Sequence, residues 1–222
     1  MQLMTLPKAL IFDMDGLMLE SERLYQQAWK IAASELGYEL DAALYLSLVG
    51  RSNAEAEQAF VKVFGTGFPT AAFNAGWHAH WHTLIQSEGV SLKPGLLQLL
   101  DWTEQQAIPK AVGTSSNFAE ADLCLSAAGI RGRFSTVVTV DQVAAGKPEP
   151  DIFLEAANRL NIDPGQCLVL EDSNAGVQAA QSAGIPVMMV PDLQVPTEAS
   201  KAIALAVLPS LHEVGAWLQQ VG

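Results

Sequence analysis

Short apolar runs and longer helical stripes of apolar residues alternate along most of the chain. The first run, Ala9–Phe12, is four residues long and ends at two aspartates and a glycine, which is typical of a strand buried on both faces. Similar runs, one of them β-branched throughout, predict further strands at residues 110–114, 136–140, 167–170, 186–190 and 204–208. The pattern therefore predicts a buried sheet of up to six strands.

Helices are predicted between these strands, because apolar residues recur there at spacings of three and four. One helix is expected to begin at Pro94, and the last at Ser210, where Glu213 would complete a capping box. Others are expected at residues 118–128, 152–160 and 174–183. A strand followed by a helix, repeated, predicts an α/β fold with a doubly wound, Rossmann-like parallel sheet.

The stretch from residue 17 to residue 91 has a different pattern. Helical segments are expected at residues 24–36, 42–48, 54–64 and 71–87, with Ser21 as the first N-cap and Gly37 as the first stop. No strand is expected in this stretch. We therefore predict two domains, an α/β core made of residues 1–16 and 92–222, and an inserted helical domain made of residues 17–91.

Composition narrows the class of protein and of partner. Half of the 222 residues are hydrophobic and 16% are charged, which favours a compact fold over disorder. The 24 acidic residues outnumber the 12 basic ones, so the net charge of −12 repels nucleic acid and anionic membranes, and neither is expected as a partner. Cys124 and Cys167 lack metal-ligand spacing and are expected to be reduced core thiols.

The sequence also bears on where the protein is located and whether it assembles. The run Ala9–Phe12 is too short for the apolar part of an export signal and is followed by acids. No apolar run approaches the length of a membrane span. We expect a cytoplasmic monomer.

Asp13 and Asp15 stand where the first strand ends. Two unit charges about 4 Å apart repel by roughly 4 kcal/mol at an effective dielectric constant of 20, so a cation is the natural remedy. Taken alone, the Asp13–Gly16 motif fits a solvated turn equally well. The residues at the ends of the other strands decide between these two interpretations.

The loops after the second and third strands add an anion site and a lysine. Thr114 precedes a predicted helix, and a hydroxyl beside the backbone N–H groups of a helix N-terminus suits an anion. The alternative is an ordinary N-cap by Ser116 or Asn117. Lys147 stands before two prolines, where a solvated lysine is the alternative.

Glu171 and Asp172 form a second acidic pair at the end of the fourth strand, where acids at a helix N-terminus are the alternative explanation. In a parallel sheet all four groups would meet at one edge, which coincidence explains poorly. Mg²⁺ takes oxygen ligands and keeps waters for a phosphate, so Asp13, Asp172 and the backbone carbonyl of Asp15 could hold it.

These four motifs resemble, in order and spacing, those of the haloacid dehalogenase-like hydrolase superfamily, over nearly the whole chain. The motifs are Asp13-Met14-Asp15-Gly16, Thr114-Ser115-Ser116, Lys147-Pro148 and Glu171-Asp172-Ser173. The chain is most similar to the branch with β-phosphoglucomutase and small sugar-phosphate phosphatases. In that branch a helical cap follows the first motif, as residues 17–91 would.

The resemblance implies a role for each motif. Asp13 would be the nucleophile that forms an aspartyl-phosphate, and Asp15 the acid and base for the leaving oxygen and for water. Lys147 would neutralise charge together with Mg²⁺, and Thr114 would hold phosphoryl oxygens. The substrate would also meet Ser115, Ser116 and Asn117. The expected metal residues are Asp13, Asp15, Glu171 and Asp172, with Glu171 acting through water.

The inserted region supplies further candidates. The loop at residues 49–52 resembles a cap loop that touches substrate, so Gly50 and Arg51 are expected to bind substrate, together with Glu22; a surface turn with a solvated arginine is the alternative. His78 and His82 are one helical turn apart and could bind a transition metal. A helix that buries Trp77 and Trp81 and leaves its histidines in solvent is favoured instead.

The predicted activity is Mg²⁺-dependent hydrolysis of a small phosphorylated metabolite, a sugar phosphate, through an aspartyl-phosphate on Asp13. A phosphosugar mutase is the alternative, but the mutase has a histidine twelve residues after the nucleophile, where this chain has Tyr25. A 2-haloacid dehalogenase lacks the second acid, so Asp15 argues against it. The intact motifs argue against a non-catalytic binder of a phosphorylated ligand.

Overall fold

The chain folds into two compact units. The computed structural model describes residues 5–48 and 53–221. Contacts divide the chain into a sheet unit, Met1–Glu20 with Ser91–Gly222, and a helical unit, Ser21–Val90. Residues 17–20, expected in the inserted domain, fall in the sheet unit because Leu19 pairs with Leu92 in an isolated bridge and Met18 O accepts a hydrogen bond from Lys93 N. The helical unit is therefore slightly shorter than the expected insertion.

The sheet unit is built on one six-stranded parallel sheet, in the order β3-β2-β1-β4-β5-β6. The central strand, β1 (Ala9–Phe12), pairs with β2 (Lys110–Gly113) on one side and with β4 (Cys167–Glu171) on the other. The outer strands are β3 (Thr136–Val138), β5 (Val187–Met189) and β6 (Ala206–Val207). Every residue of β1, β2 and β4 is buried, as the unbroken apolar runs require.

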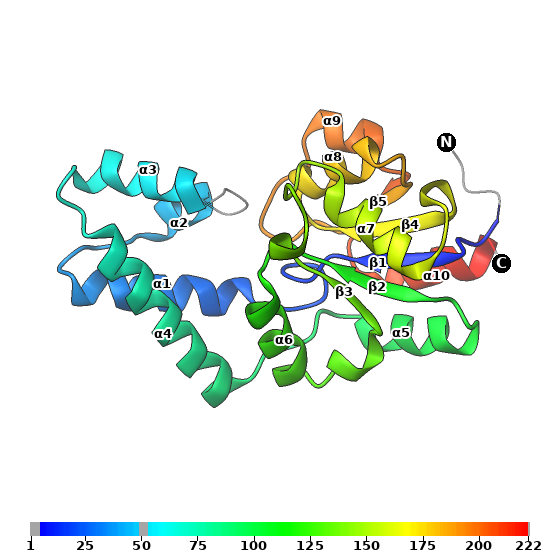
Figure 1. The fold of residues 1–222 in the computed structure, drawn as a ribbon, viewed down its shortest axis with the longest axis horizontal. Helices are drawn as coiled ribbons and strands as arrows, with labels where there is room; N and C mark the ends of the chain where they lie inside the picture. Colours follow the sequence, from blue (N-terminus) through cyan, green and yellow to red (C-terminus); the bar gives the residue numbers. More distant parts are fainter. Residues whose placement is uncertain (1–4, 49–52, 222) are drawn as a thin grey trace. The chain divides into compact units, whose positions relative to one another are not determined.

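Helices cover both faces of this sheet (Figure 1). On one side lie α7 (Asp151–Leu160), α8 (Asn174–Ser182) and α9 (Glu198–Ile203). On the other lie α5 (Leu96–Gln105), α6 (Phe118–Ala127) and α10 (Leu211–Val221). Short 3₁₀ turns occupy Arg131–Arg133, Val140–Gln142 and Pro164–Gln166. The predicted doubly wound α/β fold is confirmed.

The apolar side chains of the central strands alternate between two cores. Ile11 belongs to the cluster beneath α7 and α8, which includes Phe153 and Val177. Phe12 points to the opposite face, where its ring meets Phe134 edge to face at 5.8 Å. Cys124 and Cys167 are buried and free, as expected.

Three predicted boundaries were wrong for identifiable reasons. The third strand ends at Val138, because Thr139 bonds Asp141 and the chain turns into a 3₁₀ helix. The sixth strand has two residues and not five. The helix expected at Pro94 begins at Leu96. Gly95 has a φ of 90° and lies close to the backbone of α10, so residues 94 and 95 do not form the first turn of the helix.

The cap of α10 also differs from the predicted box. Ser210 Oγ accepts a hydrogen bond from His212 N at 3.1 Å and donates one to Glu213. The two predicted residues therefore cap the helix, but by a different pairing of donors and acceptors.

The helical unit holds four helices with an aromatic core. They are α1 (Glu22–Glu35), α2 (Ala42–Leu48), α3 (Asn53–Phe64) and α4 (Thr70–Glu88). α1 packs along α4, with Tyr25 stacked on Trp81 at 5.1 Å and Trp29 against Trp77 at 6.0 Å. Trp77 and Trp81 are buried, as predicted. Ser21 occupies the N-cap position of α1, but its side chain makes no capping hydrogen bond.

None of the helices within the described part of the chain combines the length and apolar character needed to cross a membrane.

Candidate active site

The central strands bring three of the predicted site residues to one edge of the sheet. Asp13 follows β1, Thr114 follows β2, and Glu171 is the last residue of β4. The backbone continues the sheet pairing past the strand ends: Asp13 N donates to Leu170 O and Thr114 N donates to Val138 O, both at 3.0 Å. The side chains therefore start from fixed positions at the carboxyl ends of neighbouring parallel strands.

Lys147 joins two of the acids at this edge. Its ammonium donates hydrogen bonds to Asp13 Oδ1 and, at 2.6 Å, to Glu171 Oε1. Only 4% of the lysine side chain is exposed, and Nζ lies 4.8 Å from the centre of the Phe153 ring. The lysine therefore points into the cluster of acids, as the sequence suggested, and its charge is held there by ion pairs and a cation–π contact.

Burial changes the charge balance of this cluster. Burial raises the pKa of Asp13 to about 7, with Glu171 adding to the rise, while Lys147 opposes it. Burial also raises the pKa of Asp172, helped by the charges of Glu171 and Asp13. For Lys147, burial works against the charge, but Asp13 and Glu171 raise the pKa above its usual range. One ammonium thus faces more carboxylate charge than it neutralises.

Three carboxylates are placed to share a divalent cation. Asp13, Glu171 and Asp172 each offer an oxygen within 4.8 Å of the others, and among the described residues this is the one such group of three or more metal-ligating side chains. An all-oxygen donor set with excess negative charge fits a hard cation such as Mg²⁺. The residues present therefore fit the metal that the sequence suggested.

Gly16 leaves space for the carboxylate of Asp172. Its φ is 85°, a conformation that L side chains rarely adopt, and a Cβ built on it would lie 2.4 Å from Asp172 Oδ2. Asp192 Oδ2, from the loop after β5, would lie 3.3 Å from the same point. Asp192 was not among the predicted site residues, because the apolar pattern carries no sign that its loop returns to this edge.

Both carboxylate oxygens of Glu171 accept hydrogen bonds from protein donors. Oε1 accepts from Lys147, and Oε2 accepts from Ser173 N at 2.7 Å and Ser173 Oγ at 2.9 Å. Gly176 leaves space for this carboxylate, since a Cβ there would lie 1.8 Å from Oε1. Both carboxylate oxygens of Glu171 are therefore engaged by protein donors, and Oε1 holds the Lys147 ammonium.

Asp15 is held by a serine of the second motif. Ser116 Oγ donates to Asp15 Oδ2 at 2.8 Å, which ties residues 101 apart in the sequence. Ser116 N in turn donates to Thr114 Oγ1 at 3.1 Å, and Thr114 is buried, whereas Ser115 is exposed. Ser116 therefore positions Asp15, a contact for which the local sequence pattern carries no signal.

Asn117 serves as the cap of α6. Its side-chain oxygen accepts from Glu120 N at 3.0 Å, and Glu120 Oε2 accepts from Asn117 N at 3.3 Å, completing a capping box. The helix-cap alternative thus holds for this residue.

In the helical unit, Glu22 and the histidines have local partners. Glu22 Oε2 accepts from the Tyr45 hydroxyl at 2.6 Å. His80 Nε2 bonds Glu35 at 2.9 Å, and burial, with the nearby charge of His82, lowers the pKa of His78. The metal group found among the described residues does not include these histidines. Gly50 and Arg51 lie outside the described residues.

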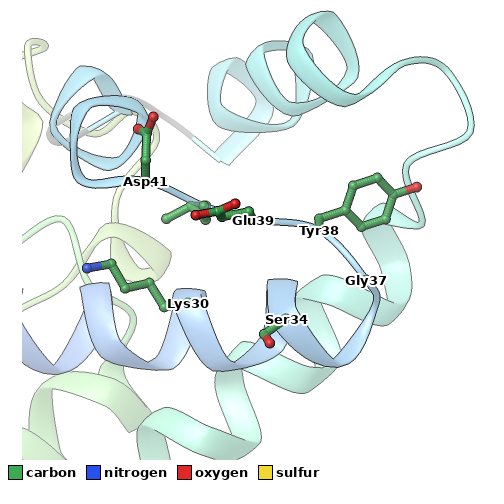
Figure 2. Close-up of a pocket in the computed structure, with 7 residues that line it drawn as sticks. Lys30, Ser34, Gly37, Tyr38, Glu39 and Asp41 are labelled. Carbon is green, nitrogen blue, oxygen red and sulfur yellow. The ribbon is translucent and has the colours of Figure 1, made fainter.

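The helical unit also carries an open hollow beside the connection from α1 to α2. Figure 2 shows Lys30, Glu39 and Asp41 around it, while the Tyr38 ring extends away. Asp41 Oδ1 is engaged by Leu44 N at 2.7 Å, capping α2. The hollow therefore mixes one ammonium with two carboxylates, unlike the anion site expected for a phosphorylated ligand.

The chain is similar to a known protein family and to proteins of known fold. The family model described as a haloacid dehalogenase-like hydrolase matches residues 7–184. The chain is also similar to fructose-1-phosphate phosphatase YqaB from Escherichia coli, with 34% identity over 177 residues that cover 79% of this chain and 92% of the relative.

Two solved structures share the fold over nearly the whole chain. A mutant of CbbY from Rhodobacter sphaeroides, in complex with xylulose-1,5-bisphosphate, is 26% identical, with a TM-score of 0.82 and coverage of 94% of this chain and 96% of the other. A β-phosphoglucomutase-like protein from Thermotoga maritima is 30% identical, with a TM-score of 0.82 and coverage of 96% and 99%.

Proposed function

The chain belongs to the haloacid dehalogenase-like hydrolases, and from this premise we propose that it is a Mg²⁺-dependent phosphatase that hydrolyses a small sugar phosphate through an aspartyl-phosphate on Asp13. The observation that carries the proposal is the buried Lys147 ammonium between Asp13 and Glu171, with Asp172 beside them. A carboxylate attacks an anionic phosphoryl group only where positive charge offsets the repulsion.

In the first half-reaction, a carboxylate oxygen of Asp13 forms a bond to phosphorus while the bond from phosphorus to the sugar oxygen breaks. The carboxyl group of Asp15 gives its proton to that oxygen, and Ser116 keeps Asp15 oriented through its 2.8 Å hydrogen bond. Thr114 Oγ1 already accepts from Ser116 N, so its own proton is available to a phosphoryl oxygen. The sugar leaves with a free hydroxyl group.

In the second half-reaction, the Asp15 carboxylate takes a proton from water as the water oxygen bonds to phosphorus and the bond to Asp13 breaks. Inorganic phosphate leaves, Asp13 returns to the carboxylate form, and Asp15 is again protonated. Asp13 and Asp15 thereby return to their starting states, and the net reaction is hydrolysis of the bond between phosphorus and the sugar oxygen.

Asp13, Asp172 and the backbone carbonyl of Asp15 would hold Mg²⁺, with Glu171 outside them, and the ion would neutralise phosphoryl charge when bound. Lys147 adds to this neutralisation and, together with the ion, favours the ionised form of Asp13 that attack requires. The helical unit would act as the cap, collecting binding energy from the sugar and excluding water.

Hydrolysis is favoured over phosphate migration. YqaB is named as a fructose-1-phosphate phosphatase, and the CbbY complex holds a sugar bisphosphate, which supports a sugar phosphate as substrate. Similarity to the Thermotoga maritima protein keeps a mutase as the second candidate. At the position where the mutase would have a histidine, Tyr25 stacks on Trp81 and cannot supply an imidazole. We also propose that the enzyme works as a monomer in the cytoplasm.

A substrate panel tests this function. Sugar phosphates and other phosphomonoesters are incubated with the protein and Mg²⁺, and both phosphate release and isomer formation are measured. We expect phosphate release without migration of phosphate between C1 and C6, and loss of turnover in Asp13→Asn and after EDTA treatment. Glu198→Gln, which changes an exposed acid, is the matched control. Isomer formation without phosphate release would favour the mutase.

A further inference from the structure

Lys93 forms a second ion-pair centre beside the metal-binding edge. Its ammonium donates to Asp192 Oδ1 at 2.6 Å and lies 2.9 Å from Glu20 Oε1. The side chains of Lys93 and Asp192 are 13% and 16% exposed, whereas that of Glu20 is 46% exposed. The Lys93–Asp192 pair is therefore the more buried part of this centre, and its electrostatic effect is less screened by solvent.

The backbone holds Lys93 in place. Lys93 N donates to Met18 O at 2.9 Å, and Glu20 N donates to Ser91 O at the same distance. Leu19 and Leu92 form an antiparallel bridge between these two hydrogen bonds. The ammonium thus extends from a fixed ribbon within the sheet unit, which lowers the entropy cost of keeping the pair formed.

The two carboxylate oxygens of Asp192 face different neighbours. Oδ1 faces Lys93, while Oδ2 and Asp172 Oδ2 both border the point where a Gly16 side chain would begin. Asp192 therefore lies next to an acid that would bind the metal, without belonging to the group of three.

We propose that Lys93 and Asp192 form a charge-balancing pair that sets the affinity of the neighbouring site for its divalent cation. This inference rests on the proposed Mg²⁺-dependent phosphatase and deepens it. Both are positioning residues, because they act through Asp172 and the local electrostatic field and not on the phosphoryl group.

Coulomb's law gives opposite signs for the two halves of the pair. Neutralising Asp192 leaves the Lys93 ammonium less balanced, and this repels a cation. Neutralising Lys93 leaves the Asp192 carboxylate unbalanced, and this attracts a cation. Neutralising both restores the original sum of charges. If the pair only held the loops in place, both substitutions would weaken Mg²⁺ binding.

Isothermal titration calorimetry with Mg²⁺ alone tests the pair, with no substrate present. We expect Asp192→Asn to weaken Mg²⁺ binding about tenfold, the size typical of residues just outside the direct ligands. Lys93→Met should tighten it several-fold, and the double variant should return to within about twofold of wild type, since opposite charge changes cancel. Glu20→Gln removes the exposed partner of the same lysine and is the matched control, expected within about twofold of wild type.

Circular dichroism and thermal unfolding check that each variant is folded. Should Lys93→Met not fold, Lys93→Gln replaces it with the same expected direction, and Lys93→Arg should keep wild-type affinity. Equal weakening of Mg²⁺ binding by Lys93→Met and Asp192→Asn, or no change in either variant, would contradict the proposed role of the pair. If the wild type still binds Mg²⁺ in that case, the proposed phosphatase function is not affected. Absence of Mg²⁺ binding in the wild type would overturn both.

Discussion

Lys147 and Glu171 form a buried ion pair, with Nζ 2.6 Å from Oε1, although Lys147 comes from the loop before α7 and Glu171 is the last residue of β4. The side chain of Glu171 is 1% exposed and its second oxygen is bonded to Ser173. This pairing fixes the ammonium beside Asp13, so that positive charge lies at the proposed nucleophile before a substrate arrives.

Removing the ammonium is expected to disable catalysis. Lys147→Met leaves Asp13 without the side-chain charge that opposes the rise of its pKa, and leaves the metal as the remaining proposed cationic partner of the phosphoryl oxygens. We expect kcat for phosphate release to fall by about a hundredfold or more. Lys201→Met, which removes an exposed lysine paired with Glu198, is the control and should keep kcat. A Lys147→Met enzyme that is folded and retains wild-type kcat would contradict this role.

Metal binding should depend on pH because cation and proton compete for the same carboxylates. The pKa of Asp13 is raised to about 7 and that of Asp172 is also raised, so both acids hold protons more tightly than usual. Since Mg²⁺ binds the ionised forms, lowering the pH from 8 to 6 should weaken binding by about tenfold or more, with protons released on binding. Calorimetry in buffers of different ionisation enthalpy measures both effects. A Kd that is constant over this range would be inconsistent with the raised pKa of Asp13.

The same shift has a consequence for the stability of the metal-free protein. A carboxyl group whose pKa rises on folding, here from 3.8 to about 7, binds more protons in the folded state than in the unfolded state between those values. Its contribution to the free energy of unfolding therefore decreases as pH rises from about 4 to about 7. Denaturant unfolding in EDTA should show this decrease for the wild type and a smaller one for Asp13→Asn. Equal slopes in the two proteins would contradict it.

Gly16 should tolerate no side chain. In Gly16→Ala the new Cβ would meet Asp172 at 2.4 Å, and the φ of 85° would be strained. We expect loss of Mg²⁺ binding, measured by calorimetry, in addition to a stability cost of about 1–2 kcal/mol for the left-handed conformation. Gly184→Ala is the matched control: its φ is also positive, but it has open space around it, so it should lose stability alone. Unchanged Mg²⁺ affinity in Gly16→Ala would contradict the proposed place of the metal.

Much of the fold could be predicted because its signals are local. Unbroken apolar runs such as Ala9–Phe12 are typical of buried strands, and the candidate site residues Asp13, Thr114 and Glu171 come together because each stands at the end of such a strand. The position of Lys147 followed from the same reasoning, since its loop returns to the same edge.

The remaining errors and omissions depend on contacts that the local pattern does not encode. The Lys93–Asp192 pair joins residues 99 apart, and the Ser116–Asp15 bond joins residues 101 apart. Helix starts were missed where tertiary contacts decide them, as at Gly95, whose backbone lies against α10. The role of the helical unit as a cap stays a prediction, because substrate contacts are the only evidence that would define it.

The central claim, an aspartyl-phosphate on Asp13, is tested most directly by mass spectrometry of Asp15→Asn after incubation with Mg²⁺ and an aryl phosphate whose leaving group needs no proton. Without the residue that activates water, the adduct should accumulate. We expect one phosphoryl group on the peptide that contains Asp13, and none when Asp13→Asn is added to the variant. No adduct on a folded, Mg²⁺-binding protein, or an adduct on another residue, would contradict the account.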